Sequence, residues 1–167
     1  MFSFTQIDPQ WNKEILTHHS DQKEPDYIED WGCLLVSYAN ILNHRGYNIT
    51  PKNLNDKLKA NLGYLYLYDK SVDAGVASFL RSEIIEKYYN CSIINIENKS
   101  LKYNINIYYI AMIKSKLPIM GKVITVNHFI NVIEEDDKNN KICFDVYNGE
   151  IKKISNNKIL KLKRMVF

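Results

Sequence analysis

The chain has 167 residues, of which 46% are hydrophobic and 25% charged, and its net charge is +3. This length and composition predict one globular domain, residues 1–167, with a substantial core. So small a charge does not indicate a nucleic-acid or membrane partner. Basic residues gather near the C-terminus, but in KILKLKRMVF (158–167) they alternate with apolar ones, which is typical of the solvent face or edge of a final strand. We expect no nucleic acid among the partners.

The cysteines and the N-terminus bear on compartment and cofactors. The chain has three cysteines, Cys33, Cys91 and Cys143, which lie far apart in the sequence. Their odd number and wide spacing argue against a disulfide framework. We interpret Cys91 and Cys143 as structural. No secretory signal opens the chain and no apolar run is long enough to span a membrane. We therefore expect a cytoplasmic protein without membrane insertion. No cysteine pair, HExxH motif or phosphate-binding glycine loop is present, so we expect neither a metal nor a cofactor.

The N-terminal part of the chain predicts an irregular entry followed by a helix. Residues 1–16 look extended, and residues 17–30 are polar without apolar periodicity, as in a surface loop. A helix is predicted to begin at Cys33 and to end at Gly46. Its apolar positions follow helical spacing: Leu35, Tyr38, Ala39 and Leu42.

Further helices are expected along the middle of the chain. Thr50 is a suitable N-cap and Pro51 suits the first helical position, so a second helix is predicted from there to about Gly63. Apolar spacing predicts a third helical stretch over 71–88 and a fourth over 107–116.

The remainder predicts strands. Residues 92–96 suit a short strand, and 117–126, 128–135 and 141–149 are alternating or fully apolar. The polar run 134–141 suits a hairpin loop. Helices followed by an antiparallel meander predict an α+β domain, with N-terminal helices packed on an antiparallel β-sheet.

One constellation in this sequence suggests covalent chemistry. Cys33 opens a helix, where free N–H groups and the helix dipole favour thiolate over thiol, and Trp31 and Gly32 before it suit a tight turn beside a cleft. His128 begins a strand, and Asp145 lies on the next strand across a hairpin, where its carboxylate would orient the imidazole. From these residues alone, both a nucleophile and a buried structural cysteine remain open.

Four stretches of sequence carry a resemblance to a known family: FTQIDPQW, DWGCLLVSYANILNHRGYNITPKNLNDKL, ANLGYLYLYDKSV, and LPIMGKVITVNHFINV followed by ICFDVYNGE. Together they resemble the bacteriocin-processing-peptidase-like group of papain-fold cysteine peptidases, of the type found in bacterial and phage genomes. The resemblance spans most of the chain and implies a papain-like fold. Its most specific feature is the Gly-Cys helix followed by Gly-x-x-x-Thr-Pro-x-x-Leu-Asn, and the histidine and aspartate elements contribute through their order and place.

The resemblance assigns a role to each candidate site residue. Cys33 matches the nucleophile, His128 the general base and Asp145 the acid that orients it. Gln6 matches the glutamine of the oxyanion hole, and Gln10 is the alternative for that role.

Two classes of function follow from the resemblance. The first is a cysteine peptidase or amide hydrolase that acts through a thioester, on peptidoglycan peptide or on a protein substrate, in a bacterial or phage setting. The alternative is a catalytically silent papain-fold binding or structural protein, for instance in a virion. Transfer of the acyl group to an amine would use the same thioester chemistry. The oligomeric state and the substrate sequence cannot be predicted from these residues.

Overall fold

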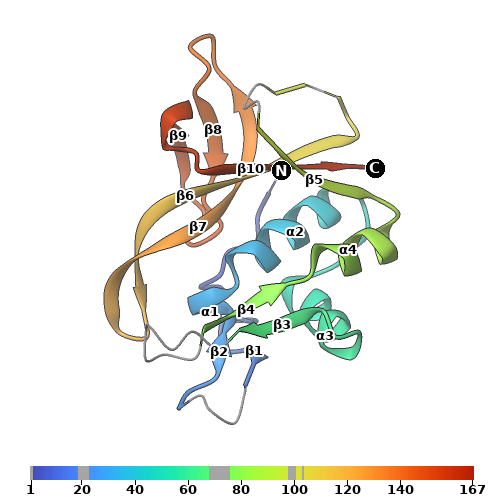
Figure 1. Ribbon diagram of the computed structural model, residues 1–167, viewed down its shortest axis with the longest axis vertical. Helices are drawn as coiled ribbons and strands as arrows, with labels where there is room; N and C mark the ends of the chain where they lie inside the picture. Colours follow the sequence, from blue (N-terminus) through green and yellow to red (C-terminus); the bar gives the residue numbers. More distant parts are fainter. Residues whose placement is uncertain (1, 19–22, 68–75, 98–100, 103) are drawn as a thin grey trace.

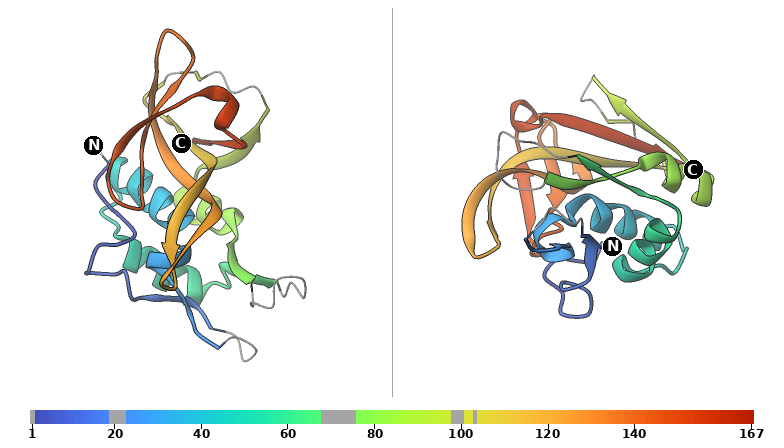
Figure 2. Two further views of the ribbon diagram at one scale, coloured as in Figure 1. Left: turned by 90° about the vertical axis from the view of Figure 1, so that its left-hand side faces the viewer. Right: turned by 60° about the horizontal axis from the view of Figure 1, so that its bottom comes forward.

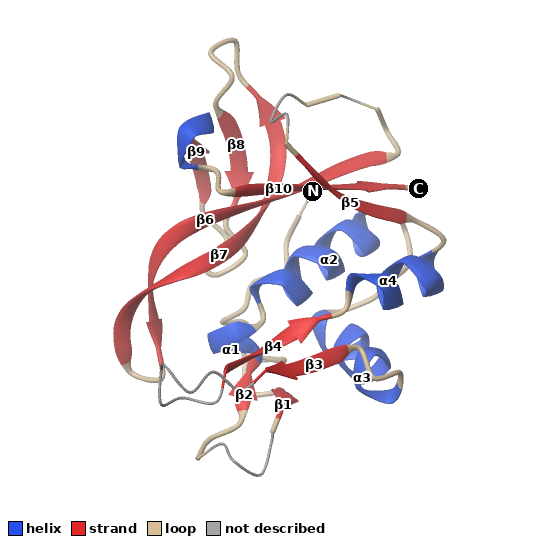
Figure 3. Cartoon of the chain, viewed as in Figure 1, coloured by secondary structure: helices blue, strands red, loops and turns tan. Residues whose placement is uncertain are grey.

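The computed structural model describes residues 2–18, 23–67, 76–97, 101–102 and 104–167. Within them the protein is a mixed α/β structure of four helices and a six-stranded antiparallel sheet (Figures 1 and 3). The helices are α1 (Ile28–Trp31), α2 (Cys33–His44), α3 (Pro51–Ala60) and α4 (Ser82–Tyr89), with a 3-10 turn at Asn156–Lys158. The strands are β1 (Ile15–Thr17), β2 (Asp26–Tyr27), β3 (Tyr64–Leu67), β4 (Val76–Leu80), β5 (Ser92–Ile96), β6 (Ile107–Ile119), β7 (Lys122–Glu135), β8 (Lys141–Phe144), β9 (Ile151–Ile154) and β10 (Lys161–Val166).

Helices α2 and α3 have the ends that the sequence predicts. The chain leaves α2 through Gly46, whose φ of +90° lies in the left-handed region. At the start of α3, the Thr50 hydroxyl accepts a hydrogen bond from the Asn53 N–H at 3.2 Å, and Pro51 occupies the first turn. Both helices are specified by local signals, which explains why the sequence was sufficient to predict them.

Helix α2 is the central element of the helical layer, because eight consecutive residues, Leu35–Leu42, are buried. It contacts three other parts of the protein through polar groups. Asn40 hydrogen-bonds the backbone of the N-terminal segment at Phe4, and the Tyr38 hydroxyl lies 2.8 Å from the Ser82 hydroxyl at the start of α4. Asn131 of β7 donates to the Ser37 carbonyl at 3.0 Å. Figure 2 shows the helices on one side of the sheet, with α2 against β7.

The six-stranded sheet has the order β5-β10-β6-β7-β8-β9, with every pair antiparallel. Strands β6 to β9 form an antiparallel meander, as expected, but with different strand boundaries. The turn between β6 and β7 falls inside the predicted strand 117–126, and His128 lies within β7 rather than at its start. The prediction of a final strand is confirmed, and of its two alternatives, a solvent face or a sheet edge, the edge is wrong. Strand β10 lies between β5 and β6, and it buries Leu162 and Met165. Alternating charge marks the solvent face of such a strand, but it carries no information about which strands lie beside it.

The prediction of a helix over 107–116 is wrong, because these residues belong to β6. This segment is rich in β-branched and aromatic residues, and its pairing with β7 from Tyr109 to Ile119 outweighs the weak helical spacing. A two-residue turn, Met120-Gly121, joins the two strands with φ values of +49° and +74°, as in a type I′ turn. Pro118 is accommodated because β10 pairs only with residues 107–112, so β6 has one neighbour there.

Two other segments differ from the sequence prediction. The expected helix over 71–88 is divided into strand β4 and helix α4, and its first five positions lie outside the described residues. The expected surface loop over 17–30 contains β2 and α1, with Asp26 and Ile28 buried. Four helical residues and a two-residue strand are too short to produce a periodic pattern.

Candidate active site

The first turn of α2 brings Cys33 to the interface between the helices and the sheet. Gly32 precedes it, and a Cβ at Gly32 would lie 2.6 Å from the Ile28 carbonyl oxygen. Glycine is therefore required here by close packing rather than by an unusual φ, which is −81°. Because Cys33 is the first residue of the helix, its backbone N–H has no intrahelical acceptor and is available to a ligand. The Cys33 side chain is half-buried.

His128 and Asp145 form a buried hydrogen-bonded pair. Their strands are neighbours: His128 lies within β7, and Asp145 follows β8 directly. Imidazole Nε2 donates to Asp145 Oδ1 at 2.6 Å, and both side chains are at most 1% exposed. Three residues farther along β7, Asn131 is bonded to α2, which fixes the position of the strand relative to the helix. The imidazole is thus oriented by a carboxylate on one nitrogen.

The other imidazole nitrogen is the one left for Cys33. His128 Nδ1 is buried and has no hydrogen-bonding partner among the described residues. The Cys33 thiol nevertheless lies close enough to the ring to raise the pKa of His128. Catalytic hydrogen bonds are often long or poorly aligned in proteins without a bound substrate.

The charges of this group favour the imidazolium. Burial by itself lowers the pKa of His128, but the Asp145 carboxylate and the Cys33 sulfur raise it to about 9. Burial likewise opposes ionisation of Asp145, yet its bonds to His128, to Lys152 and to a backbone N–H hold its pKa well below the usual range. At neutral pH the arrangement therefore favours a carboxylate and an imidazolium beside the sulfur.

A network of donors surrounds Asp145. The Lys152 ammonium on β9 lies 2.6 Å from Oδ2, and the Tyr147 N–H donates to Oδ1 at 2.9 Å. Lys152 also pairs with Glu150 at 3.1 Å. Burial lowers the pKa of Lys152, and its two carboxylate partners more than reverse that effect. Lys152 was not predicted as a site residue. Its place beside Asp145 depends on the register of β8 and β9, in which Lys152 pairs with Cys143.

The Gln6 side chain is engaged by the helix that precedes Cys33. Its side chain is fully buried, and Nε2 donates to the carbonyls of Ile28 at 3.0 Å and Glu29 at 3.3 Å. Both amide protons are thus directed at the helix that precedes Cys33, whereas Oε1 has no partner among the described residues. The alternative residue, Gln10, is exposed.

The other two cysteines lie in different surroundings. Burial raises the pKa of Cys91 to about 11 and that of Cys143 to about 12, so both stay protonated at neutral pH. Cys143 is fully buried in β8. Trp31, which sequence analysis placed at a cleft wall, packs against the core.

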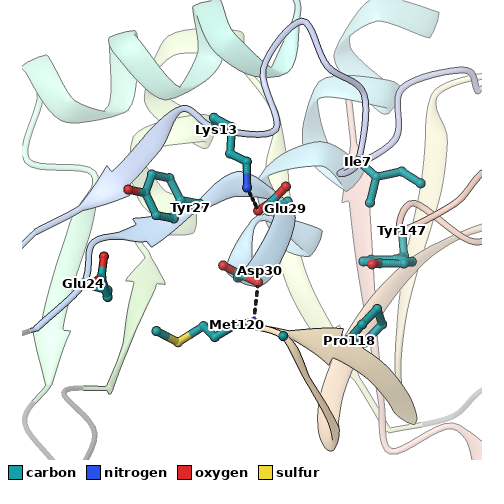
Figure 4. Close-up of a pocket in the computed structure, with 10 residues that line it drawn as sticks. Ile7, Lys13, Glu24, Tyr27, Glu29, Asp30, Pro118, Met120 and Tyr147 are labelled. Atoms are coloured by element: carbon teal, nitrogen blue, oxygen red, sulfur yellow. Dashed lines mark hydrogen bonds and ion pairs between the residues drawn. The ribbon is translucent and has the colours of Figure 1, made fainter.

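A cleft of about 520 Å³ lies between segments that carry the candidate site residues, although Cys33, His128, Asp145 and Gln6 do not themselves line it (Figure 4). Three of the segments that line it lie next to a candidate site residue in the chain: Ile7 follows Gln6, Tyr147 binds Asp145 through its N–H, and α1 leads into Cys33. The tip of the β6–β7 hairpin closes the cleft at Met120, whose N–H donates to Asp30 at 3.0 Å. This arrangement is typical of a ligand site between two layers.

The described residues contain no cluster of His, Cys, Asp and Glu side chains arranged to hold a metal ion. In the same part of the chain, no helix is both long and apolar enough to cross a membrane. No protein-family model matches this chain, and a search of curated proteins finds no significant match. The chemistry of the site therefore rests on its own geometry.

Proposed function

We propose that this chain is a cysteine hydrolase of the papain-like type that cleaves a peptide or amide bond through a thioester. The observation that carries the proposal is the buried His128–Asp145 pair beside the sulfur of Cys33 at the start of a helix. A lone cysteine in this position would be ordinary, but a core that only needed packing would not bury an imidazole and a carboxylate together.

The proposed reaction begins with proton transfer from Cys33 to His128 Nδ1. The thiolate then attacks the substrate carbonyl carbon, and the oxygen takes up the negative charge. The imidazolium donates its proton to the leaving amine as the carbon–nitrogen bond breaks, which leaves a thioester on Cys33. A water molecule, deprotonated by His128, then attacks the thioester, so the acid is released and the thiol is restored. Asp145 keeps the imidazole oriented throughout.

The developing oxyanion needs donors that are already in place. The Cys33 backbone N–H supplies one. Gln6 supplies a second if its Nε2 exchanges the longer of its two carbonyl bonds, that to Glu29, for the oxyanion. This exchange costs little free energy, because the hydrogen bond to the charged oxyanion is stronger than the lost bond to the neutral Glu29 carbonyl.

Digestion of a complex peptide library, followed by mass spectrometry, tests this proposal. The wild-type protein is expected to generate new peptide termini at neutral pH, and Cys33→Ala is expected to generate none. Parallel reactions with an added amine separate hydrolysis from acyl transfer, since an amide product would replace the free acid. Absence of new termini from the wild-type protein at high enzyme concentration would contradict the proposal and favour the silent binding protein.

A further inference from the structure

The cleft beside the candidate active site carries an excess of negative charge. The described residues that line it include the carboxylates of Glu24, Glu29 and Asp30 and a single basic side chain, that of Lys13. Glu29 is partly neutralised, because Lys13 forms an ion pair with it and the Asn12 amide donates to it at 3.1 Å. The remaining charge is concentrated on the other two carboxylates.

Asp30 is the carboxylate placed to bind a ligand. It is half-buried, and Oδ1 accepts the Met120 N–H at the tip of the β6–β7 hairpin. No described residue donates to Oδ2. Figure 4 shows the carboxylate in the middle of the cleft, between Tyr27 and Glu24 on one side and Tyr147 and Pro118 on the other. Its structural bond to the hairpin thus leaves one oxygen for another partner.

The surroundings of Asp30 favour a cation over a neutral group. Burial and the charge of Glu29 raise the pKa of Asp30, and burial and both carboxylates raise that of Tyr147, so negative potential is not cancelled in this cleft. A partly desolvated carboxylate gains more from a cation than an exposed one does. The rings of Tyr27 and Tyr147 and the side chain of Met120 offer apolar surface for a methylene stem.

We propose that this cleft is a specificity site for a lysine or arginine side chain of the peptide substrate, with Asp30 as the acceptor of its charge. The inference rests on the proposed hydrolase function for the identity of the ligand. The walls of the cleft support a substrate role, because three of the segments that form it carry Gln6, Cys33 and Asp145.

Binding of matched peptides to the intact chain with Cys33→Ala tests this inference without any need for turnover. The probes are fluorescent peptide pools with acetylated N-termini, in which one position at a time is fixed as lysine, arginine, norleucine or glutamate. Fluorescence polarisation is expected to give about tenfold tighter binding for lysine and arginine than for norleucine at one position. The preference should shrink as salt is added.

Asp30→Asn on the same background is the critical variant. The asparagine oxygen can still accept the Met120 N–H, so the hairpin contact is kept while the charge is lost. The preference for lysine over norleucine is expected to disappear, whereas Asp137→Asn, the same change on an exposed loop, should retain it. Equal binding of the lysine and norleucine pools, or a preference that survives Asp30→Asn, would overturn the inference.

Cleavage of the same pools by the wild-type protein separates this inference from the proposed function. Cleavage without preference at any position would refute the cationic site and leave the hydrolase standing. A preference in binding without any cleavage would support the cationic site and contradict the hydrolase.

Discussion

Asp145→Asn is the substitution whose effect follows most directly from the geometry. It preserves the shape of the side chain and an oxygen able to accept from His128 Nε2, but it removes the negative charge. A pKa of about 9 at His128, against an ordinary value of 6.5, corresponds to about 3 kcal/mol in favour of the imidazolium. Asp145 and Cys33 share this stabilisation, and burial opposes it.

If Asp145 supplies half of this stabilisation, its loss lowers the pKa of His128 by at least about one unit, to about 8 or below. The imidazolium would then be a weaker counterion for the Cys33 thiolate, so alkylation of Cys33 by iodoacetamide should slow at neutral pH. NMR titration of the His128 ring measures the pKa, and its signal is identified by its loss in His128→Ala. Asp137→Asn, an exposed position with the same charge change, is the control. A His128 pKa that stays near 9 in Asp145→Asn would refute the reasoning.

Three further predictions concern the same site. Lys152→Met should raise the pKa of His128 in an NMR titration, since Asp145 loses a competing cation, whereas Lys152→Arg should stay near wild type; identical pKa values in both variants would show that the charge of Lys152 does not compete with His128 for Asp145. Gly32→Ala should lower the free energy of unfolding by about 1–3 kcal/mol in urea titrations, because the new methyl group overlaps the Ile28 carbonyl; an unchanged midpoint would show that the turn relaxes freely. On a cleaved peptide, kcat/KM should fall as pH rises through about 9, since His128 then loses the proton it gives to the leaving amine; a plateau beyond that pH would be inconsistent with this role.

The parts of the fold that could be predicted from sequence are those with local signals. Thr50 and Pro51 mark the start of α3, and Gly46 marks the end of α2, because capping and left-handed conformations depend on the residue itself. The wrong assignment of β6 has a physical origin. A buried apolar segment fits helical and strand spacing equally well, and only its partner β7 decides between them.

The candidate site likewise contains residues that could be predicted from the sequence and residues that could not. Cys33 is indicated by its place at a helix start, and His128 and Asp145 by their order on consecutive strands. Lys152 and Asp30 could not be predicted, since the first depends on the register of β8 and β9 and the second on a hairpin tip that returns to α1. Neither the position of Lys152 nor that of Asp30 can be predicted from the residues beside it in the sequence.

The measurement that tests the central claim most directly is the rate of Cys33 alkylation by iodoacetamide as a function of pH, in the wild-type protein and in His128→Ala. Mass spectrometry of digested samples assigns each modified site, and buried Cys143 serves as an internal control. We expect wild-type Cys33 to react at a pH well below the ordinary thiol pKa of about 8.5, and His128→Ala to move this reactivity to higher pH. Cys33 that reacts only at or above that pKa, or with the same profile in both proteins, would contradict this expectation.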